Sequence, residues 1–463
     1  MIDHSRIPLM QLAWPLLVEN ILRTSLMSVD TLMLSHYSSD AVAAMSLASQ
    51  FAYFIQLLYM MVSIGSSVLI TQNLGAGRPR QAGLYGVGSL TLIVGVSLVV
   101  SVLIALGGGL VVDLYRLDPQ VARYARQFLT IYGGLSFFMA INVGQASILR
   151  SWGFARDPML VNVLCLLLTV GGNALCLFGL FGFPVLGVIG VAASTVASQA
   201  VGCVLSAWMI HRRRGLELPL REAKHLPAHI YRSILVIGIP TAGENISYSL
   251  SQIVVLAMLS SMGTLALTTY GILMAILRYV FMPGVSIGAA GQLLVGYLVG
   301  AGRHGEATRR VYRYFATGIS ISVVLVVALQ VVHRPLLGLF SQDPRVFALA
   351  ASVLLVSLVL EPGRNLNTIV VPALKGAGDV RVPVCIAIAS MWGVSVLGAW
   401  FLGVWLGMGL VGVWMAMAAD EWLRGIVMLL RWRSGVWRRS ALISRAGGGA
   451  VASVAQLEIE EGL

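Results

Sequence analysis

Two short stretches decide the fold of this chain: Pro15-Leu-Leu-Val-Glu-Asn-Ile21 and Pro240-Thr-Ala-Gly-Glu-Asn-Ile246. Each places a proline four residues before a Glu-Asn-Ile triplet, and the two stretches lie 225 residues apart. Self-similarity at a fixed interval is the mark of a duplicated architecture. The sequence therefore predicts a chain of two homologous halves.

Further matches extend the repeat along both halves. Most keep the interval of 225 residues, and one slips to 223 before the register recovers. The matched segments are Met33-Leu-Ser35 with Met258-Leu-Ser260, Val62-Ser-Ile-Gly65 with Val285-Ser-Ile-Gly288 (the slipped pair), Gly75-Ala-Gly-Arg78 with Gly300-Ala-Gly-Arg303, Asn142 with Asn367, and Arg150 with Lys375.

The composition indicates a membrane protein. Of 463 residues, 58% are apolar and 11% are charged, whereas a soluble domain carries roughly a quarter charged residues. Apolar runs long enough for a membrane span, about 20 residues, recur throughout, for example at 90–106, 160–180 and 382–406. Backbone groups inside lipid must bond within their own segment, so these runs are expected to be helices.

We expect an all-α membrane protein with twelve transmembrane helices. The spans are predicted at 8–34, 44–72, 84–106, 124–149, 158–181, 186–210, 233–260, 266–298, 312–332, 345–373, 381–405 and 409–431. Six helices separate equivalent points, so both halves should have the same orientation and form six-helix bundles related by a pseudo-two-fold axis along the membrane normal. Parallel repeats of this kind place a substrate site between the lobes and allow alternating access by rocking.

The predicted organisation has four parts. Residues 1–210 form the first lobe, 211–232 a basic cytoplasmic connector, 233–435 the second lobe, and 436–463 a cytoplasmic tail that we expect to be disordered.

The net charge of +12 is distributed as in an inner-membrane protein. Basic residues gather in every second loop, and the alternate loops are nearly bare, which predicts a plasma-membrane protein with both termini cytoplasmic. Anionic lipid headgroups are sufficient partners for this charge, so no nucleic acid is implied. The clusters include Arg78 and Arg80, the run Arg212 to Arg214, Arg309, Arg310 and Arg313, and Arg431 to Arg445.

No enzymatic motif is found. The chain contains no G-x-x-x-x-G-K-[ST], no HExxH and no G-x-S-x-G, and its four cysteines show no CxxC spacing. We therefore expect no catalysis, no cofactor and no bound structural metal.

Charged side chains within the predicted spans are the candidates for function. Each costs roughly 2.5–3.5 kcal/mol in the membrane on insertion scales, so such residues usually pair or face a cavity. Helical spacing pairs Glu19 with Arg23, Glu361 with Arg364, and Asp420 or Glu421 with Arg424. These pairs are compatible with a purely structural role. The charges left without a local partner are Asp30, Glu244, Arg278 and one of the acids Asp420 and Glu421.

Asp30 is the strongest candidate for coupling to an ion. It falls within about 40° of Glu19 and Arg23 around the first helix, which gives one polar stripe on an apolar span. Burial disfavours a charged carboxylate and a nearby cation favours it, so this position suits a group that exchanges a proton or cation. The alternative is an aspartate bonded permanently to a neighbouring helix. Glu244 begins a similar face in the second half, with a structural role as its alternative.

The ordered motifs resemble the multidrug and toxic compound extrusion (MATE) family across residues 8–431. The resemblance rests on Leu12-Ala-Trp-Pro15, Val29-Asp-Thr31 with Met33, Gly75-Ala-Gly-Arg78, Gly153-Phe-Ala-Arg-Asp-Pro158, the segment 182–195, Gly238-Ile-Pro240, Gly300-Ala-Gly-Arg303 and Leu374-Lys-Gly-Ala-Gly-Asp379. It implies a two-lobe antiporter, expected to be a monomer, that exports amphiphilic and often cationic compounds in exchange for Na⁺ or H⁺.

The resemblance also implies site residues. Asp30 matches the coupling aspartate of the first helix and Asn173 the amide of the fifth, while Thr195 matches a threonine of the sixth. Thr169 stands where relatives commonly carry asparagine, and its hydroxyl can still bind a cation. In the second lobe Glu244 matches an acid of the seventh helix, but Arg364 replaces an acid of the tenth.

We interpret Arg364 as a positive charge that neutralises Glu361 or Glu244, in a second-lobe cavity that also includes Asn367. This interpretation leaves Asp30, which Val255 matches in the second half, as the main coupling carboxylate.

Two other functions remain open. The charges Arg23, Arg278, Arg364 and Arg424 are compatible with a flippase for lipids or lipid-linked saccharides, and a non-transporting membrane scaffold is the alternative from another class. The aromatic residues Tyr53, Phe54 and Tyr279 and the sulfur-bearing Met274 are expected to serve helix packing rather than substrate recognition.

Overall fold

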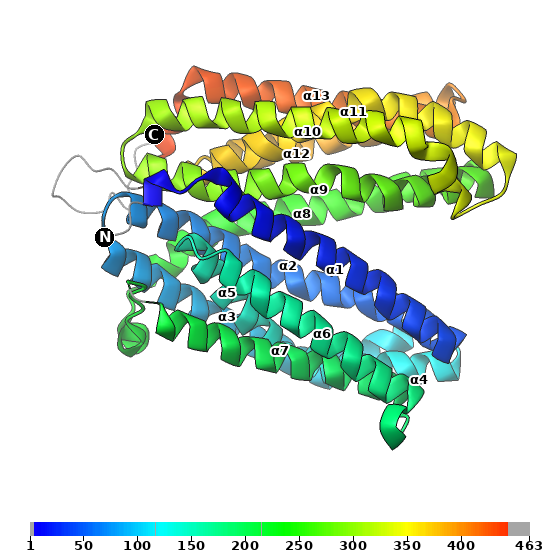
Figure 1. Ribbon diagram of the computed structural model, residues 1–463, viewed down its shortest axis with the longest axis horizontal. Helices are drawn as coiled ribbons and strands as arrows, with labels where there is room; N and C mark the ends of the chain where they lie inside the picture. Colours follow the sequence, from blue (N-terminus) through cyan, green and yellow to red (C-terminus); the bar gives the residue numbers. More distant parts are fainter. Residues whose placement is uncertain (1–3, 116, 214, 443–463) are drawn as a thin grey trace. The chain divides into compact units, whose positions relative to one another are not determined.

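The computed structural model describes residues 4–115, 117–213 and 215–442. The predicted disordered tail, 436–463, lies outside the described residues beyond 442, and so do Arg116 and Arg214. Within the described ranges the secondary structure is helical, without strands (Figure 1).

The helices of the first half follow the predicted spans. They are α1 (Leu9–Tyr37), α2 (Ser39–Gly75), α3 (Pro79–Leu114), α4 (Pro119–Phe128), α5 (Phe137–Ser151), α6 (Arg156–Phe178) and α7 (Gly187–Arg212). The predicted fourth span, 124–149, is divided between α4 and α5, with a π-helical turn at Leu129–Gly133 between them. The two parts bend by 47°.

The second half contains α8 (Ala228–Ser261), α9 (Thr264–Gly300), α10 (His304–Gly338), α11 (Pro344–Gly376), α12 (Arg381–Ser390) and α13 (Gly409–Ser434). The predicted span 381–405 begins as α12 and continues through two π-helical segments, Met391–Val396 and Ala399–Trp405. The twelve predicted spans are thus each one helix or one run of helical segments.

Eight helices in the described part are long and apolar enough to cross a membrane, and the bent α4–α5 pair makes nine. The remaining three long helices are α1, α8 and α13. They carry Glu19 and Asp30, Glu244, and the cluster of Asp420, Glu421 and Arg424, and these charges lower their apolar character.

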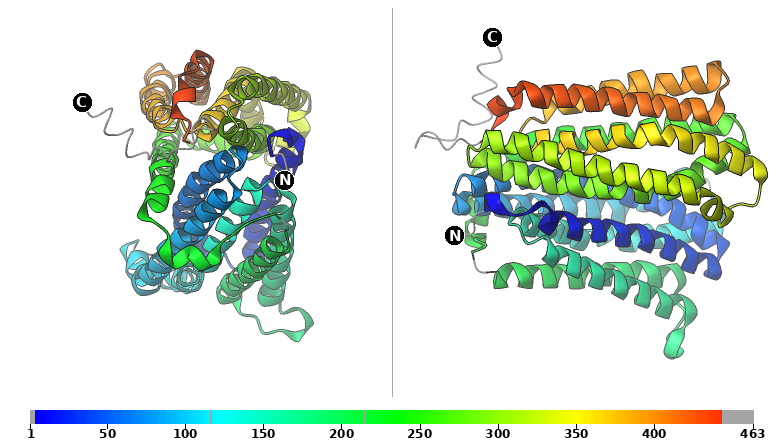
Figure 2. Two further views of the ribbon diagram at one scale, coloured as in Figure 1. Left: turned by 90° about the vertical axis from the view of Figure 1, so that its left-hand side faces the viewer. Right: turned by 45° about the horizontal axis from the view of Figure 1, so that its top comes forward.

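Contacts divide the described residues into two compact units. The first comprises Trp14–Leu74 and Arg78–Gly238, and the second comprises His4–Ala13, Gly75–Gly77 and the described part of Ile239–Leu463. In both views of Figure 2 the helices of the second unit, coloured green to red, run side by side. Within that unit α11 packs against α9, α10 and α13.

Repeated glycines explain part of the sequence repeat. Gly65 of the first unit lies against the backbone carbonyl of Ile234, and the matching Gly288 of the second lies against that of Thr368. A side chain at either position would displace a neighbouring helix, because interiors are close-packed. Gly77 and Gly302 lie two residues after the second helix of each half, with φ of 75° and 73°, a left-handed conformation that glycine adopts at low cost.

Candidate functional site

A partly buried ion pair occurs at equivalent positions in both halves. In the first, Arg150 of α5 donates to Glu19 of α1, with Nη1 3.2 Å from Oε2. In the second, Lys375 of α11 donates to Glu244 of α8, with Nζ 2.6 Å from Oε2. Both partners of each pair match at 225 residues, so the pairing itself is duplicated.

This pairing changes the interpretation of the helical spacing. The predicted partner of Glu19, Arg23, is 3.9 Å away and its side chain is 52% exposed. Glu244, which has no charge of opposite sign at helical spacing, obtains its partner from a helix 131 residues later. Spacing along one helix could not reveal either contact, although the matched positions Arg150 and Lys375 were a usable signal.

The predicted coupling residues of the first half meet between α1, α6 and α7. Asn173 of α6 donates a hydrogen bond from Nδ2 to Oδ1 of Asp30, at 2.9 Å. The hydroxyl of Ser194 in α7 donates to Oδ1 of the same asparagine. Asn173 is buried and Asp30 is partly exposed, so the carboxylate stands at the accessible end of a chain of three polar side chains.

A second polar contact lies one helical turn away. The hydroxyls of Thr169 in α6 and Ser198 in α7 are 2.7 Å apart. Asn173 and Thr169 are spaced i,i+4, and so are Ser198 and Ser194, which places each pair on one face of its helix. Helices α6 and α7 are therefore joined by two polar contacts one turn apart, Thr169 with Ser198 and Asn173 with Ser194. Asp30 of α1 bonds to the second of these contacts.

Ser194 was not among the residues predicted from the sequence, because the adjacent Thr195 was selected instead. The Thr195 hydroxyl donates to the carbonyl of Val191 in its own helix, at 2.9 Å. One residue corresponds to a rotation of 100° around the helix, so adjacent hydroxyls point to different neighbours. The i,i+4 spacing of Ser194 and Ser198 opposite that of Thr169 and Asn173 was the signal that could have identified it.

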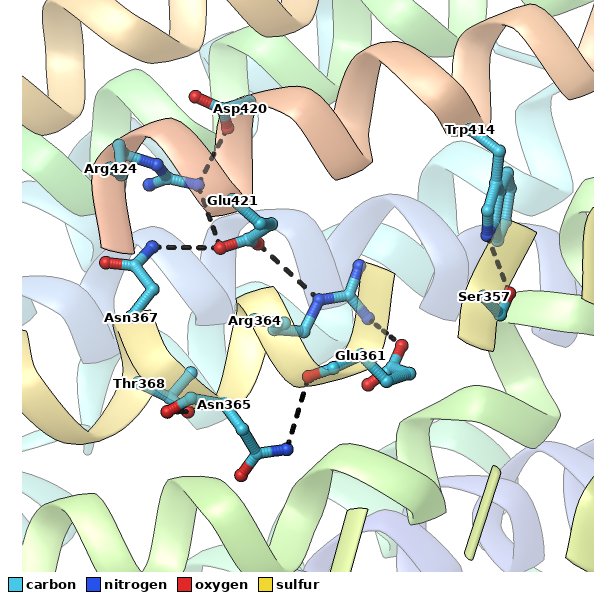
Figure 3. Close-up of polar contacts among 10 residues, drawn as sticks. All are labelled: Ser357, Glu361, Arg364, Asn365, Asn367, Thr368, Trp414, Asp420, Glu421 and Arg424. Carbon is cyan, nitrogen blue, oxygen red and sulfur yellow. Dashed lines mark hydrogen bonds and ion pairs between the residues drawn. The ribbon is translucent and has the colours of Figure 1, made fainter. Parts of the chain in front are cut away.

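The second half contains a continuous row of five charges on α11 and α13 (Figure 3). Nη1 of Arg364 donates to Oε1 of Glu361 at 2.8 Å, and its Nε lies 3.5 Å from Oε1 of Glu421. Nη2 of Arg424 lies 3.3 Å from Oε2 of Glu421 and 2.8 Å from Oδ2 of Asp420. Arg424 thus contacts both Asp420 and Glu421. The sequence interpretation had left one of these two acids without a local partner.

Neutral groups complete this row. Nδ2 of Asn367 donates to Oε2 of Glu421 at 2.9 Å, and the hydroxyl of Ser390 in α12 donates to Oδ1 of Asp420 at 2.5 Å. Asn367, which the sequence placed in a second-lobe cavity, thus hydrogen-bonds to this row of charges (Figure 3).

The row has one more acid than it has arginines. Glu361, Asp420 and Glu421 face Arg364 and Arg424, and all five side chains are largely buried. Glu361 has no exposed surface, and its Oε2 has no hydrogen-bond partner among the described residues. Arg364 pairs with both Glu361 and Glu421, while Glu244 pairs with Lys375.

Arg278 differs from the other intramembrane arginines. It lies within α9 on an exposed position, and no acid of the described chain lies within ion-pair distance of it. Its neighbour Tyr279 is 44% exposed, and Tyr53 and Phe54 of α2 are 43% and 41% exposed. These aromatic side chains are exposed, whereas Met274 packs against the core of the second unit.

A second type of ion pair, found once in each half, joins the ends of the last two spans of that half. Arg213, after α7, makes a two-pronged contact with Asp157 of α6, with distances of 2.7 and 2.5 Å. Arg431 of α13 makes the same contact with Asp379, before α12, at 2.6 and 3.1 Å. Fork-shaped contacts of this kind are strong and directional. By accepting these hydrogen bonds, Asp157 raises the pKa of the Arg213 guanidinium above its ordinary value.

Removing one of these forks should destabilise its half. Arg431→Met leaves the carboxylate of Asp379, which is 4% exposed, without its charged donor. We expect a loss of about 2 kcal/mol, the usual value for a hydrogen bond to a charged group, seen as a lower melting temperature in detergent. Arg345→Met is the matched control, because its ion pair with Asp343 is at the surface and contributes little. Equal melting temperatures for the two variants would contradict the prediction.

These features define a class of protein: a multi-pass α-helical membrane transporter of two repeated halves, with buried charges on corresponding helices. The family model described as MatE matches the chain twice, over residues 15–175 and 240–401, and its two matches begin at Pro15 and Pro240. The chain belongs to the MatE family of transporters. This result confirms the resemblance, the duplication and the twelve-helix fold.

Individual relatives agree with this assignment. The chain is 35% identical to the uncharacterized transporter YisQ of Bacillus subtilis, over 93% of this chain and 94% of the relative. It is 26% identical to the probable multidrug resistance protein NorM of Thermotoga maritima, with 96% of both chains covered.

Solved structures show the same fold. A MATE transporter in its bent conformation matches with a TM-score of 0.86 at 18% identity, over 94% of this chain and 96% of that one. A transporter of the MOP superfamily from Pyrococcus furiosus, described as having a binding pocket of reversed polarity, matches with a TM-score of 0.83 at 20% identity, over 92% and 94%.

Proposed function

We propose that this protein is a secondary antiporter that exports amphiphilic small molecules in exchange for Na⁺ or H⁺. The relatives named as multidrug resistance proteins support the export of such compounds. The observation that carries the proposal is the contact of Asp30 with Asn173 and, through it, with Ser194. A carboxylate and an amide oxygen suit a hard cation, and the same carboxylate can accept a proton.

The coupling mechanism follows from this contact. A cation or proton at Asp30 competes with the Nδ2 group of Asn173 for the same carboxylate. Its binding changes how α1 packs against α6, and Pro15 allows α1 to bend because a proline removes one helical hydrogen bond. This change weakens the hold on substrate in the outward-open state, and the ion is then carried inward.

The setting of the transporter is part of the same proposal. The distribution of basic loops supports a plasma-membrane protein with both termini in the cytoplasm and anionic lipids as partners. We further propose that it acts as a monomer. Residues 1–210 and 233–435 act as the two lobes, and 211–232 as the connector between them.

The flippase alternative loses part of its support. Two of the four arginines on which it rested, Arg364 and Arg424, have acidic partners in the second unit, and the row to which they belong carries more acids than arginines. Those two charges therefore offer no excess of positive charge to a phosphate headgroup.

Transport in reconstituted vesicles tests the proposal. We expect efflux of an amphiphilic dye to be driven by an imposed Na⁺ gradient or an imposed H⁺ gradient when each is applied alone. At least tenfold stimulation by one gradient over vesicles without a gradient identifies the coupling ion. Efflux that responds to neither gradient would contradict antiport.

A further inference from the structure

The exposed face of α9 has an unusual composition for a membrane helix. Its outward positions are small or polar up to and including Arg278. In order these residues are Thr264, Thr268, Gly271, Ala275, Arg278 and Tyr279. By contrast, α10 exposes Val323, Val324, Val327 and Val331, as expected for a face in contact with lipid chains. The face of α9 is therefore suited to water rather than to hydrocarbon.

The same face occurs in the first half. The exposed positions of α2 that lie 225 residues earlier are Ser39, Ala43, Ser46, Gln50, Tyr53 and Phe54. Every one of the six positions is exposed in both helices, and most of their residues are small or polar. A duplicated chain thus keeps an exposed stripe of mostly small or polar residues on the second helix of each half. The two stripes differ most at one position, where Tyr53 corresponds to Arg278.

Arg278 lies near the middle of α9, away from both ends of the helix. It is the fifteenth residue of α9, about 21 Å along the axis from the start of the helix and farther from its end. Long side chains reach the headgroups only from near helix ends. Arginines inside a membrane otherwise pair with an acid or face a water-filled passage, and Arg278 has no acidic partner among the described residues.

We propose that Arg278 binds an anionic group of the transported molecule, so that the substrates include amphiphiles with a carboxylate or phosphate. This proposal rests on the proposed export function and narrows its substrate class. The planar guanidinium matches two oxygens of such a group, and Tyr279 beside it offers an exposed aromatic surface for an apolar ring. A fixed positive charge also repels purely cationic compounds, an effect that grows where water is scarce.

A matched pair of dyes tests this assignment. One rhodamine carries a free benzoate, and the other is its methyl ester, which is cationic. In vesicles with the driving gradient, we expect Arg278→Gln to lower export of the benzoate dye relative to the ester by about 10- to 100-fold, the factor for losing a charged hydrogen bond. Arg278→Lys should retain an intermediate preference, because it keeps the charge but not the fork.

The control is Arg313→Gln, which makes the same charge change at another exposed arginine, near the start of α10. It should leave the ratio of the two dyes unchanged. An unchanged dye ratio in Arg278→Gln, together with unchanged movement of an anionic lipid, would overturn the assignment even if both dyes are exported. Export of neither dye by the unaltered protein would count against the proposed function itself.

A fluorescent phosphatidylglycerol in the same vesicles distinguishes the source of the anion. Arg278-dependent movement of this lipid between leaflets, with no difference between the dyes, would assign the anionic group to a headgroup phosphate. Arg278-dependent export of the benzoate dye without lipid movement would assign it to a soluble amphiphile.

Discussion

Asp30→Asn should abolish ion-coupled efflux while the helices remain folded. The asparagine has nearly the shape of aspartate and can still accept the hydrogen bond from Asn173, so the contact between α1 and α6 persists. It carries no charge for Na⁺ and cannot take up a proton at neutral pH. We expect gradient-driven transport to fall at least 100-fold, because a coupled step needs the ion site and no other residue of this contact is ionisable.

The measurement compares gradient-driven efflux with simple substrate exchange in vesicles. Exchange needs substrate binding but no ion, so it should survive in Asp30→Asn. The matched control is Asp40→Asn, which makes the same chemical change at an exposed position in the first turn of α2. Coupled transport that persists in Asp30→Asn would remove Asp30 from the coupling mechanism.

The sequence was sufficient for the fold because the fold repeats. Pro15 and Pro240, with the Glu-Asn-Ile triplets that follow them, located the two halves, and the family model begins at these two residues. Hydropathy located most of the helices, since a span must be apolar over most of its length, and its signal is weaker in the charged helices α1, α8 and α13. It could not show the 47° bend between α4 and α5, because a π-helical turn leaves an apolar run unchanged in composition.

The site could be predicted only where a contact is local or a family pattern applies. Asp30, Asn173 and Thr169 lie in the polar contacts of α1, α6 and α7. The ion pairs of Glu19 with Arg150 and of Glu244 with Lys375 join helices 131 residues apart, and the periodicity of one helix contains no information about a distant helix. The same limitation concealed the forks made by Asp157 and Asp379.

The charge row in α11 and α13 leads to the second large effect. Arg364→Met removes the positive charge between Glu361, which is buried, and Glu421, which is largely buried, and leaves two acids without the arginine between them. Removing one partner of a buried ion pair typically costs about 3–5 kcal/mol. We therefore expect little folded protein, measured as the fraction that elutes as a single species in detergent and as the melting temperature of that fraction.

Glu361→Gln provides the internal test. The row contains three acids and two arginines, and Oε2 of Glu361 has no partner in the described part of the chain. Glutamine keeps nearly the shape of glutamate and can still accept the hydrogen bond from Arg364, and it leaves two acids beside two arginines, so we expect Glu361→Gln to change stability by less than about 1 kcal/mol.

The double variant Glu361→Gln with Arg364→Met should then recover most of the stability lost in Arg364→Met, because only Glu421 remains charged between the two positions and Arg424 still lies 3.3 Å from it. A recovery of this size measures the coupling between residues 361 and 364 directly. If Glu361→Gln were as damaging as Arg364→Met, excess negative charge could not be the cause of the damage in Arg364→Met.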